Sequence, residues 1–277
     1  MSSNRDNRGR SGPGRQPDRG RDAARRKGGD GRRGRDDGAR GDNKRREDGS
    51  SRGRSGDRRS IAAVPVGGEL PRWIRDEINR TTPKDRREAA ITHLSRGVSD
   101  FADERFGAAY EQLKRAKDLA PQAATIRELL GLSAYHLERW DEALRELRTF
   151  RRISGEASQM PVELDCLRAL GRPEDVEKTY RQLQELDHHP ETDDEARVVF
   201  ASSLLDRGLV ADAWKVIKPG RLVANPRPSL LRRWFVAARV AVAGGELDAA
   251  RRLADGIAEQ EPDFPGLDDL QAEIRPT

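Results

Sequence analysis

Side chains able to hold a metal ion or act as a nucleophile are few and scattered along this chain of 277 residues. There are four histidines, and two of them, His188 and His189, are adjacent and followed by Pro190. Metal sites require clustered Cys, His or carboxylate ligands, so we interpret this pair as a solvated loop. The single cysteine, Cys166, falls within an expected helix, and the sequence suggests no histidine partner for it. We therefore expect a small buried thiol and no metal site.

Carboxylates are plentiful, but they occur at helical spacing beside arginines. Asp141, Glu142, Arg145, Glu146 and Arg148 recur at the intervals typical of ion pairs on a solvated helix face. The glycines do not form a phosphate-binding loop, because that motif requires a preceding strand and no strand pattern is present. These observations predict a non-catalytic protein with no cofactor and no small-molecule substrate.

The first 60 residues differ in composition from the rest of the chain. They contain 20 Arg and Lys, 10 Asp and Glu, and 13 Gly, but no Leu, Ile, Val, Phe, Trp or Tyr. Such a segment cannot bury enough apolar surface to offset the entropy of ordering its backbone, so we expect it to be disordered. Its formal charge is +10, whereas residues 61–277 hold 33 basic and 38 acidic side chains, a formal charge of −5. This asymmetry predicts a basic arm attached to a mildly acidic folded unit.

The basic arm has two interpretations. Arginine matches the geometry of phosphate, so one interpretation is contact with RNA or a ribosome. The arm has no aromatic side chains to stack on bases, and its acids reduce its basic character, so the other is a solubilising polyampholyte. A membrane contact is disfavoured because the arm lacks an amphipathic anchor. The candidate RNA or anion contacts are Arg32, Arg33, Arg35, Arg40, Lys44, Arg45 and Arg46.

Other features of the sequence indicate where in the cell the protein is found. One cysteine excludes an internal disulfide and fits a reducing compartment. The N-terminus has no apolar signal-peptide region. The most apolar run, WFVAARVAVA at 234–243, is too short to cross a bilayer. The excess of Arg over Lys is typical of a GC-rich bacterial genome. We therefore predict a cytoplasmic bacterial protein without a membrane anchor.

From about residue 83 the chain has a helical pattern that repeats. The gaps between successive small or apolar residues are 12, 4, 3 and 5 in a first copy formed by Gly97, Ala109, Leu113, Ala116 and Pro121. The same gaps recur 34 residues later, from Gly131 to Gly155, and again from Ala238 to Pro262, with two weaker copies between. The spacing indicates pairs of antiparallel helices in which a small residue of the first helix faces a small residue of the second.

The turn between the two helices also has a signature. In the later copies it contains a glycine, at Gly171, Gly208 and Gly245. Glycine suits the left-handed backbone conformation that often ends a helix.

These segments resemble tetratricopeptide (TPR) repeats. The resemblance is carried by GVSDFADERFGAAYEQLKRAKDLAP at 97–121 and LLGLSAYHLERWDEALRELRTF at 129–150. The second has the family's Leu-Gly pair at Leu130-Gly131, an aromatic residue at Trp140 in the turn, and the small residue Ala143. The resemblance implies an all-α fold, a right-handed superhelix of helical hairpins. We count five repeats within 83–264, at 90–123, 124–156, 157–193, 194–230 and 231–264.

The third and fourth repeats depart from the pattern. Pro161 lies in the first helix of one, and Pro219 ends the second helix of the other early. Outside the repeats, residues 61–82 are expected to form a transition and a leading helix. Residues 265–277 are expected to form a capping helix, which a repeat array needs to cover its apolar end.

The resemblance implies a concave groove lined by the first helix of each repeat. The candidate groove residues are Phe101, Glu128, Tyr135, His136, Ser202, Arg232, Phe235 and Arg239. Some TPR proteins grip a terminal carboxylate with Lys and Asn, but the corresponding positions here are Leu94, Val98, Glu128 and Leu132, so that clamp is absent. We predict a scaffold that binds a protein or peptide in the groove, with the arm as an electrostatic tether. The alternative is an RNA- or ribosome-associated factor that binds RNA through the arm.

Overall fold

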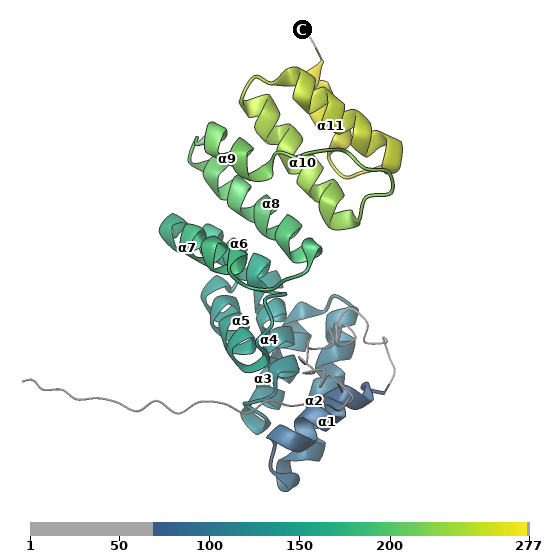
Figure 1. The fold of residues 1–277 in the computed structure, drawn as a ribbon. Helices are drawn as coiled ribbons and strands as arrows, with labels where there is room; N and C mark the ends of the chain where they lie inside the picture. The colour runs from purple at the N-terminus through teal and green to yellow at the C-terminus, as the bar shows by residue number, and fades with distance from the viewer. Residues whose placement is uncertain (1–68, 276–277) are drawn as a thin grey trace, which may run out of the picture. The chain divides into compact units, whose positions relative to one another are not determined.

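The computed structural model describes residues 69–275, which form helices joined by short turns and loops and contain no strand (Figure 1). The helices are α1 (Arg72–Thr81), α2 (Lys84–Ala102), α3 (Phe106–Leu119), α4 (Ala124–His136), α5 (Trp140–Ser154), α6 (Met160–Ala169), α7 (Pro173–Gln184), α8 (Pro190–Asp206), α9 (Val210–Ile217), α10 (Pro228–Ala243), α11 (Leu247–Gln260) and α12 (Leu267–Ile274).

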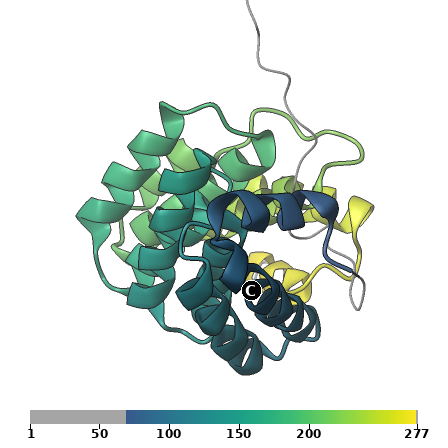
Figure 2. The same ribbon diagram turned by 90° about the horizontal axis from the view of Figure 1, so that it is seen from below.

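The helices from α2 to α11 pair as five consecutive hairpins. Within each hairpin the two helices pack on each other, and each first helix also packs on the first helix of a neighbouring hairpin. The helix α1 packs on α2 before the first hairpin, and Figure 2 looks onto this end of the described chain. The helix α12 packs on α10 and α11 after the last hairpin. The predicted fold class, an all-α solenoid of helical hairpins, is confirmed.

The turn within every hairpin is built the same way. Its central residue has a positive φ between 56° and 74°, and these residues are Glu104, Glu138, Gly171, Gly208 and Gly245. The residue after it donates its backbone N–H to the carbonyl five positions earlier, over 2.8–3.0 Å. This bond satisfies a carbonyl that the end of the first helix leaves unpaired. The prediction for the three glycines is confirmed, and the first two hairpins place glutamate in the same conformation.

Replacing Glu104 by glycine is therefore expected to stabilise the protein, by up to about 1 kcal/mol. The left-handed conformation at φ 56° crowds the Cβ of glutamate, and glycine removes this cost. The matched control is Glu111→Gly, which makes the same exchange at an exposed position inside α3 and should destabilise by about 1 kcal/mol. Urea unfolding of the two variants measures both changes. Equal losses of stability in the two variants would contradict the expectation.

The helices of the first two hairpins approach closely at a glycine. A Cβ added to Gly97 would lie 2.7 Å from Cγ of Leu113, and one added to Gly131 would lie 2.7 Å from Cγ of Leu147. Both leucines are fully buried. The expectation that a small residue faces a small residue is therefore corrected here. The larger side chain one turn further along the second helix fills the space beside each glycine, so these glycines have no room for a Cβ.

The fourth hairpin has a short second helix, as Pro219 predicted. The helix α9 ends at Ile217 after eight residues. Two arginines from neighbouring first helices bind its last carbonyls. Arg197 Nη1 donates to the Val216 carbonyl over 3.0 Å, and Arg233 Nε donates to the Ile217 carbonyl over 3.3 Å. Side chains thus replace hydrogen bonds that a longer helix would have made within itself.

The buried apolar side chains form two clusters that meet in α8. The first runs from Leu70 to Ala196 and the second from Ala201 to Ile274. The short helix α6, with Pro161 in its first turn, belongs to the first cluster. The first helices of the five hairpins pack side by side along the described chain.

Candidate functional site

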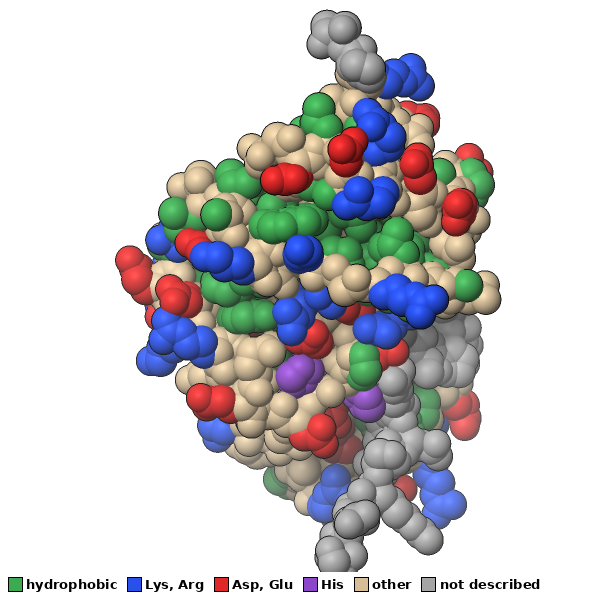
Figure 3. Space-filling view, turned by 45° about the horizontal axis from the view of Figure 1, so that its top comes forward, with side chains coloured by type: hydrophobic (Ala, Val, Ile, Leu, Met, Phe, Trp, Pro, Cys, Tyr) green, Lys and Arg blue, Asp and Glu red, His purple; other side chains and the backbone are tan. Residues whose placement is uncertain are grey.

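A cavity of about 340 Å³ lies among the first helices of the second to fifth hairpins. We call it the inter-hairpin pocket. It is lined by Tyr135, Ser158, Gln159, Pro161, Val162, Asp165, Glu191, Thr192, Glu195, Val199 and Arg232. Its apolar side chains come from α6 and α8, and polar groups from four helices and the segment before α6 surround them. Figure 3 shows the same mixture on one face of the molecule, where hydrophobic side chains reach the surface between charged ones.

A hydrogen bond fixes the polar group on the α4 side of the pocket. The Tyr135 hydroxyl donates to Asp165 Oδ2 over 2.6 Å. Burial, and then this bond to a carboxylate, raise the pKa of Tyr135, so the phenol keeps its proton. Arg168 Nη1 donates to the other oxygen of Asp165 over 3.3 Å, and Arg168 Nε donates to Asp206 over 2.6 Å. These bonds connect α4, α6 and α8 and hold Tyr135 and Asp165 in place.

An ion pair forms the opposite side of the pocket. Arg232 of α10 pairs with Glu195 of α8, and both side chains line the cavity. The Glu195 side chain is 29% exposed and that of Arg232 is 51% exposed. The carboxylate is thus held within the wall, while the guanidinium lies nearer the solvent.

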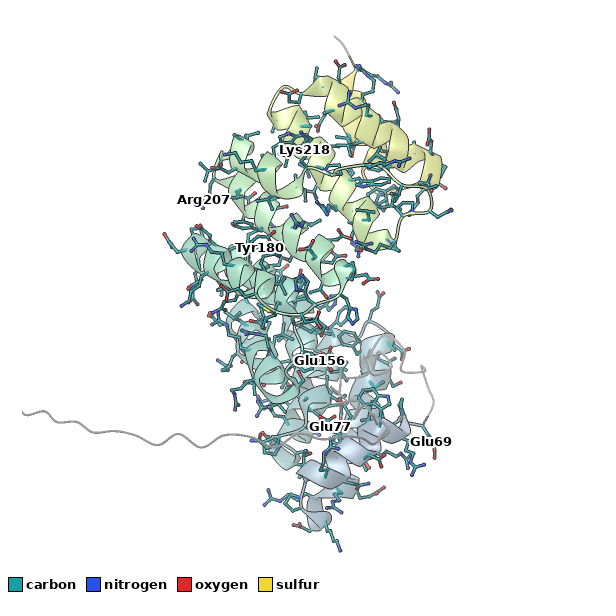
Figure 4. The ribbon with its side chains drawn as sticks, in the orientation of Figure 1. Glu69, Glu77, Glu156, Tyr180, Arg207 and Lys218 are labelled. Carbon is teal, nitrogen blue, oxygen red and sulfur yellow. The ribbon has the colours of Figure 1, made fainter. Side chains whose placement is uncertain are left out.

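A buried carboxylate lies behind the pocket wall. Glu128 of α4 is 8% exposed, and Gln159 Nε2 donates to its Oε1 over 2.7 Å. Burial raises the pKa of Glu128 to about 7, and the charges of Glu156 and Glu77, both labelled in Figure 4, raise it further against the lowering effect of the Gln159 bond. Glu77 is itself held by the start of α4, because the Ala124 backbone N–H donates to its carboxylate over 2.6 Å.

Comparison with known proteins identifies the fold. No protein-family model and no curated protein sequence matches the chain. Among solved structures, the apo form of the quorum sensor NprR from B. thuringiensis is 14% identical with a TM-score of 0.53, over 72% of this chain and 62% of that chain. The crystal structure of YrrB, described as a TPR protein with an unusual peptide-binding site, is 18% identical with a TM-score of 0.46, over 72% of this chain and 97% of that chain.

The fold is that of a TPR solenoid. The five hairpins, their common turn and the likeness to NprR agree on this point. The chain spans 62% of the length of the NprR structure, and at 14% identity the likeness concerns the fold alone. The resemblance predicted from 97–121 and 129–150 is thus confirmed at the level of the fold.

Only part of the predicted groove forms the pocket of this TPR solenoid. Tyr135 and Arg232 line it, and Glu128 lies buried behind it. Phe101 and His136 lie elsewhere, beside the turn of the first hairpin, where Phe106 stacks on His136 with ring centroids 3.9 Å apart. Burial lowers the pKa of His136, so this stack contains a neutral imidazole near pH 7.

The remaining predicted groove residues have other roles or positions. The Ser202 hydroxyl donates to the Val198 carbonyl of its own helix over 2.8 Å. Phe235 packs against Phe264, with ring centroids 5.3 Å apart, beneath the start of α12. Arg239 is exposed on α10 and does not line the pocket.

Nine of the eleven residues that line the pocket are not among the candidate groove residues named from the sequence. The most important are Val162 and Asp165 on α6 and Val199 on α8. Alignment of the third repeat with the second could have located Asp165. Leu164 corresponds to Gly131 in that alignment, and Asp165 is the next residue along the same first helix. The proline in this repeat obscured that alignment.

The structure also bears on the predicted absence of catalytic chemistry. Within residues 69–275, no group of three or more His, Cys, Asp or Glu side chains could hold a metal ion. Cys166 is fully buried in α6, and burial raises the pKa of its thiol to about 12, so the thiol is protonated near neutral pH. His188 and His189 lie just before α8, where His188 Nδ1 is 2.8 Å from the Leu186 carbonyl.

Two further predictions concern membranes and the basic arm. None of the helices in the described part of the chain combines the length and the hydropathy needed to cross a bilayer. The arm, with its candidate contacts from Arg32 to Arg46, lies outside the described residues. RNA binding and electrostatic tethering by the arm therefore stay predictions.

A second depression, of about 410 Å³, lies at the turn of the second hairpin. It is lined by Glu138, Arg139, Trp140, Asp141, Glu142 and Leu170. Five of these six residues are consecutive, and four are charged, so most of this depression is the surface of one turn. The inter-hairpin pocket is smaller, but it is built from separate elements around apolar side chains, which is the usual composition of a binding site.

Proposed function

We propose that this protein is a non-catalytic TPR scaffold that binds a peptide, or a segment of a partner protein, in the inter-hairpin pocket. One observation carries the proposal: first helices from four successive hairpins build one pocket, in which apolar side chains of α6 and α8, Val162 and Val199 among them, lie within a frame of fixed polar groups. An apolar centre gives affinity by excluding water, and fixed polar groups orient a ligand.

The geometry suits a ligand that crosses several repeats. The pocket extends from Tyr135 on α4 to Arg232 on α10, so a bound segment would contact every first helix between them. The polar groups at the two ends belong to ordered pairs, Tyr135 with Asp165 and Arg232 with Glu195. Binding would therefore require little reordering of the wall, which reduces its entropic cost.

Replacing Val199 by glutamate is expected to abolish peptide capture without unfolding the protein. Val199 is half-buried in the pocket wall, and the new carboxylate would keep water in the apolar centre. The matched control is Val223→Glu, the same exchange at a side chain that is 45% exposed on the loop before α10. The measurement is enrichment of peptides from a displayed random library by the immobilised full-length protein.

Wild type and Val223→Glu should enrich the same peptides, and Val199→Glu should enrich none of them. Circular dichroism must show that Val199→Glu keeps its helical content. Retention of the same peptides by this folded variant would place the binding surface elsewhere and reject the proposal.

A further inference from the structure

We propose that α1 is a movable cover over the groove of the first hairpin, and that ionisation of Glu128 in α4 releases it. The cover would control access to the groove itself, whichever ligand the inter-hairpin pocket binds. It would give the solenoid a response to pH that is built into its fold.

The helix α1 fills groove positions of the first hairpin. The TPR pattern assigns Leu94 and Val98 of α2 to the groove, yet Leu94 is fully buried and Val98 is only 8% exposed. On the α1 side, Leu70, Ile74 and Ile78 recur every four residues, so they form one apolar stripe. All five side chains belong to the same apolar cluster, and α1 packs on α2. A segment of the chain itself therefore occupies this part of the groove.

A carboxylate fastens α1 to the second hairpin. Glu77 Oε1 accepts the Ala124 backbone N–H over 2.6 Å, and Glu77 Oε2 accepts the Thr125 hydroxyl over 2.5 Å. Both donors lie in the first turn of α4, where backbone N–H groups lack partners within the helix. The closed position of α1 on α4 thus depends on a negative charge, and a further negative charge nearby would weaken it.

The closed position also buries polar atoms without partners. Within residues 69–275, three buried side-chain polar atoms have no hydrogen-bond partner, and two of them are Arg75 Nε on α1 and Thr82 Oγ1 in the link to α2. Each costs free energy, because it has lost water and gained no partner. Opening of α1 would return both atoms to water, which offsets part of the apolar contact that opening gives up.

Glu128 lies on α4 one turn beyond the residues that hold Glu77. It is 8% exposed, and its Oε1 accepts a hydrogen bond from Gln159. Burial raises the pKa of Glu128 to about 7, and the carboxylates of Glu156 and Glu77 raise it further against the Gln159 bond. Glu77 faces it from α1, and Glu156 from the segment before α6. Loss of the Glu128 proton therefore adds a third negative charge beside these two carboxylates.

The other helices that pack on α4 carry charged and titratable groups that bind one another. These contacts are Asp100 with Arg105, His93 with Gln112, Lys117 and Arg127 with Glu146, and Arg148 and Arg151 with Glu163. In the described part of the chain no ion pair reaches Glu128. Movement of α1 would relieve the ionised carboxylate, because it would take the Glu77 charge away and admit water.

The closed state thus binds the proton of Glu128 more tightly than the open state. Opening lowers the pKa of Glu128 toward its ordinary value, so the closed state loses stability as the pH rises toward 7 and above. Gln159 still covers Glu128 after α1 moves, so only part of the difference is recovered. A pKa that falls by about one on opening corresponds to an open population about tenfold larger above pH 7. At pH 4 both states keep the proton, and α1 stays closed.

Hydrogen exchange of the full-length protein, followed by mass spectrometry, measures the opening of α1. Wild type and Glu128→Gln are compared at the same pH, so the intrinsic exchange rate cancels. At pH 8 the amides of α1 should exchange about tenfold faster in wild type than in Glu128→Gln, and at pH 4 equally fast. The helix α12, beyond the last hairpin, is the internal reference and should exchange at one rate in both proteins. The control Glu111→Gln, on the exposed face of α3, should behave as wild type.

A thiol placed beneath α1 reports the same movement independently. Val98→Cys introduces a thiol at a groove position that α1 covers, whereas the native Cys166 is fully buried in α6. At pH 8 a thiol reagent should modify the new thiol about tenfold more slowly when Glu128→Gln is also present. Both proteins are measured at the same pH, so the fraction of thiolate is the same in each.

Equal exchange of α1 in wild type and Glu128→Gln at pH 8 would overturn the inference, as would equal rates of thiol modification. Slowing of α12 to the same extent as α1 would also overturn it, because the variant would then act on global stability. A difference in α1 that persists undiminished at pH 4 would assign the effect to packing and reject the role of the charge. Each of these results would leave the proposed function standing, since none of them involves a ligand.

Discussion

Replacing Asp194 by alanine is expected to destabilise the protein by about 3–5 kcal/mol, because it removes the carboxylate from a buried ion-pair network. Asp194 is 1% exposed on α8. Its Oδ2 accepts hydrogen bonds from Arg227 Nε over 2.8 Å and from the Ser229 hydroxyl over 3.1 Å, and its Oδ1 accepts from Arg233 Nη1 over 3.2 Å. Alanine would leave the largely buried Arg233 guanidinium without its carboxylate.

The measurement is the free energy of unfolding from urea titration followed by circular dichroism. The control is Asp212→Ala, which removes a carboxylate that pairs with Lys215 on the surface of α9. Both partners there are more than half exposed, so little change is expected. Asp194→Asn should fall between the two, since an amide keeps the acceptor oxygen and loses the charge. Similar small losses in Asp194→Ala and Asp212→Ala would contradict the assigned role of the network.

Replacing Glu128 by glutamine is expected to stabilise the protein by up to about 3 kcal/mol at pH 8, and to change little at pH 4. The pKa of Glu128 is raised from 4.5 to about 7 by burial. The unfolded chain therefore loses this proton at lower pH than the folded protein does. Stability falls as the pH rises from 4.5 to 7, and the loss is complete above the folded pKa. Glutamine keeps an acceptor for Gln159 and carries no charge to desolvate.

Urea titrations at several pH values measure this difference. The control is Glu111→Gln on the exposed face of α3, for which no such pH dependence is expected. The gap between wild type and Glu128→Gln should open between pH 4.5 and 7 and then stay constant. A gap that is equally large at pH 4 would show that the effect comes from packing rather than from the charge.

The sequence predicts the solenoid because its packing rules are local. The 34-residue recurrence that includes Gly97 and Gly131 reflects the contact of each glycine with a leucine sixteen positions later. The glycines in the turns mark positions with a left-handed backbone conformation, which glycine favours, so the sequence alone indicates these turns. The short length of α9 follows from Pro219. Each of these features depends on a few residues within one hairpin, so each can be inferred without knowledge of the partner helices.

The pocket is less predictable because it depends on contacts between hairpins. Phe235 occupies a position that the TPR pattern assigns to the groove, yet Phe264 and the start of α12 pack against it. Glu128 also has a groove register, but the segment before α6 supplies Gln159 and covers it. Asp165 and Val162 belong to the repeat in which Pro161 shifts the helix start, so the family pattern does not align them. Long-range packing determines each of these outcomes.

The meeting of the two apolar clusters in α8 has a consequence for cooperativity. In a repeat array each hairpin is stabilised mainly by its neighbours. The helices of one apolar cluster form one block and those of the other cluster form a second, and at the boundary between them one block can unfold while the other stays folded. The inter-hairpin pocket lies across this boundary, with Tyr135 on the α4 side and Arg232 on the α10 side. A ligand bound there would contact both blocks at once. It would therefore join two folding units into one, and its binding energy would appear as a sharper unfolding transition as well as a later one.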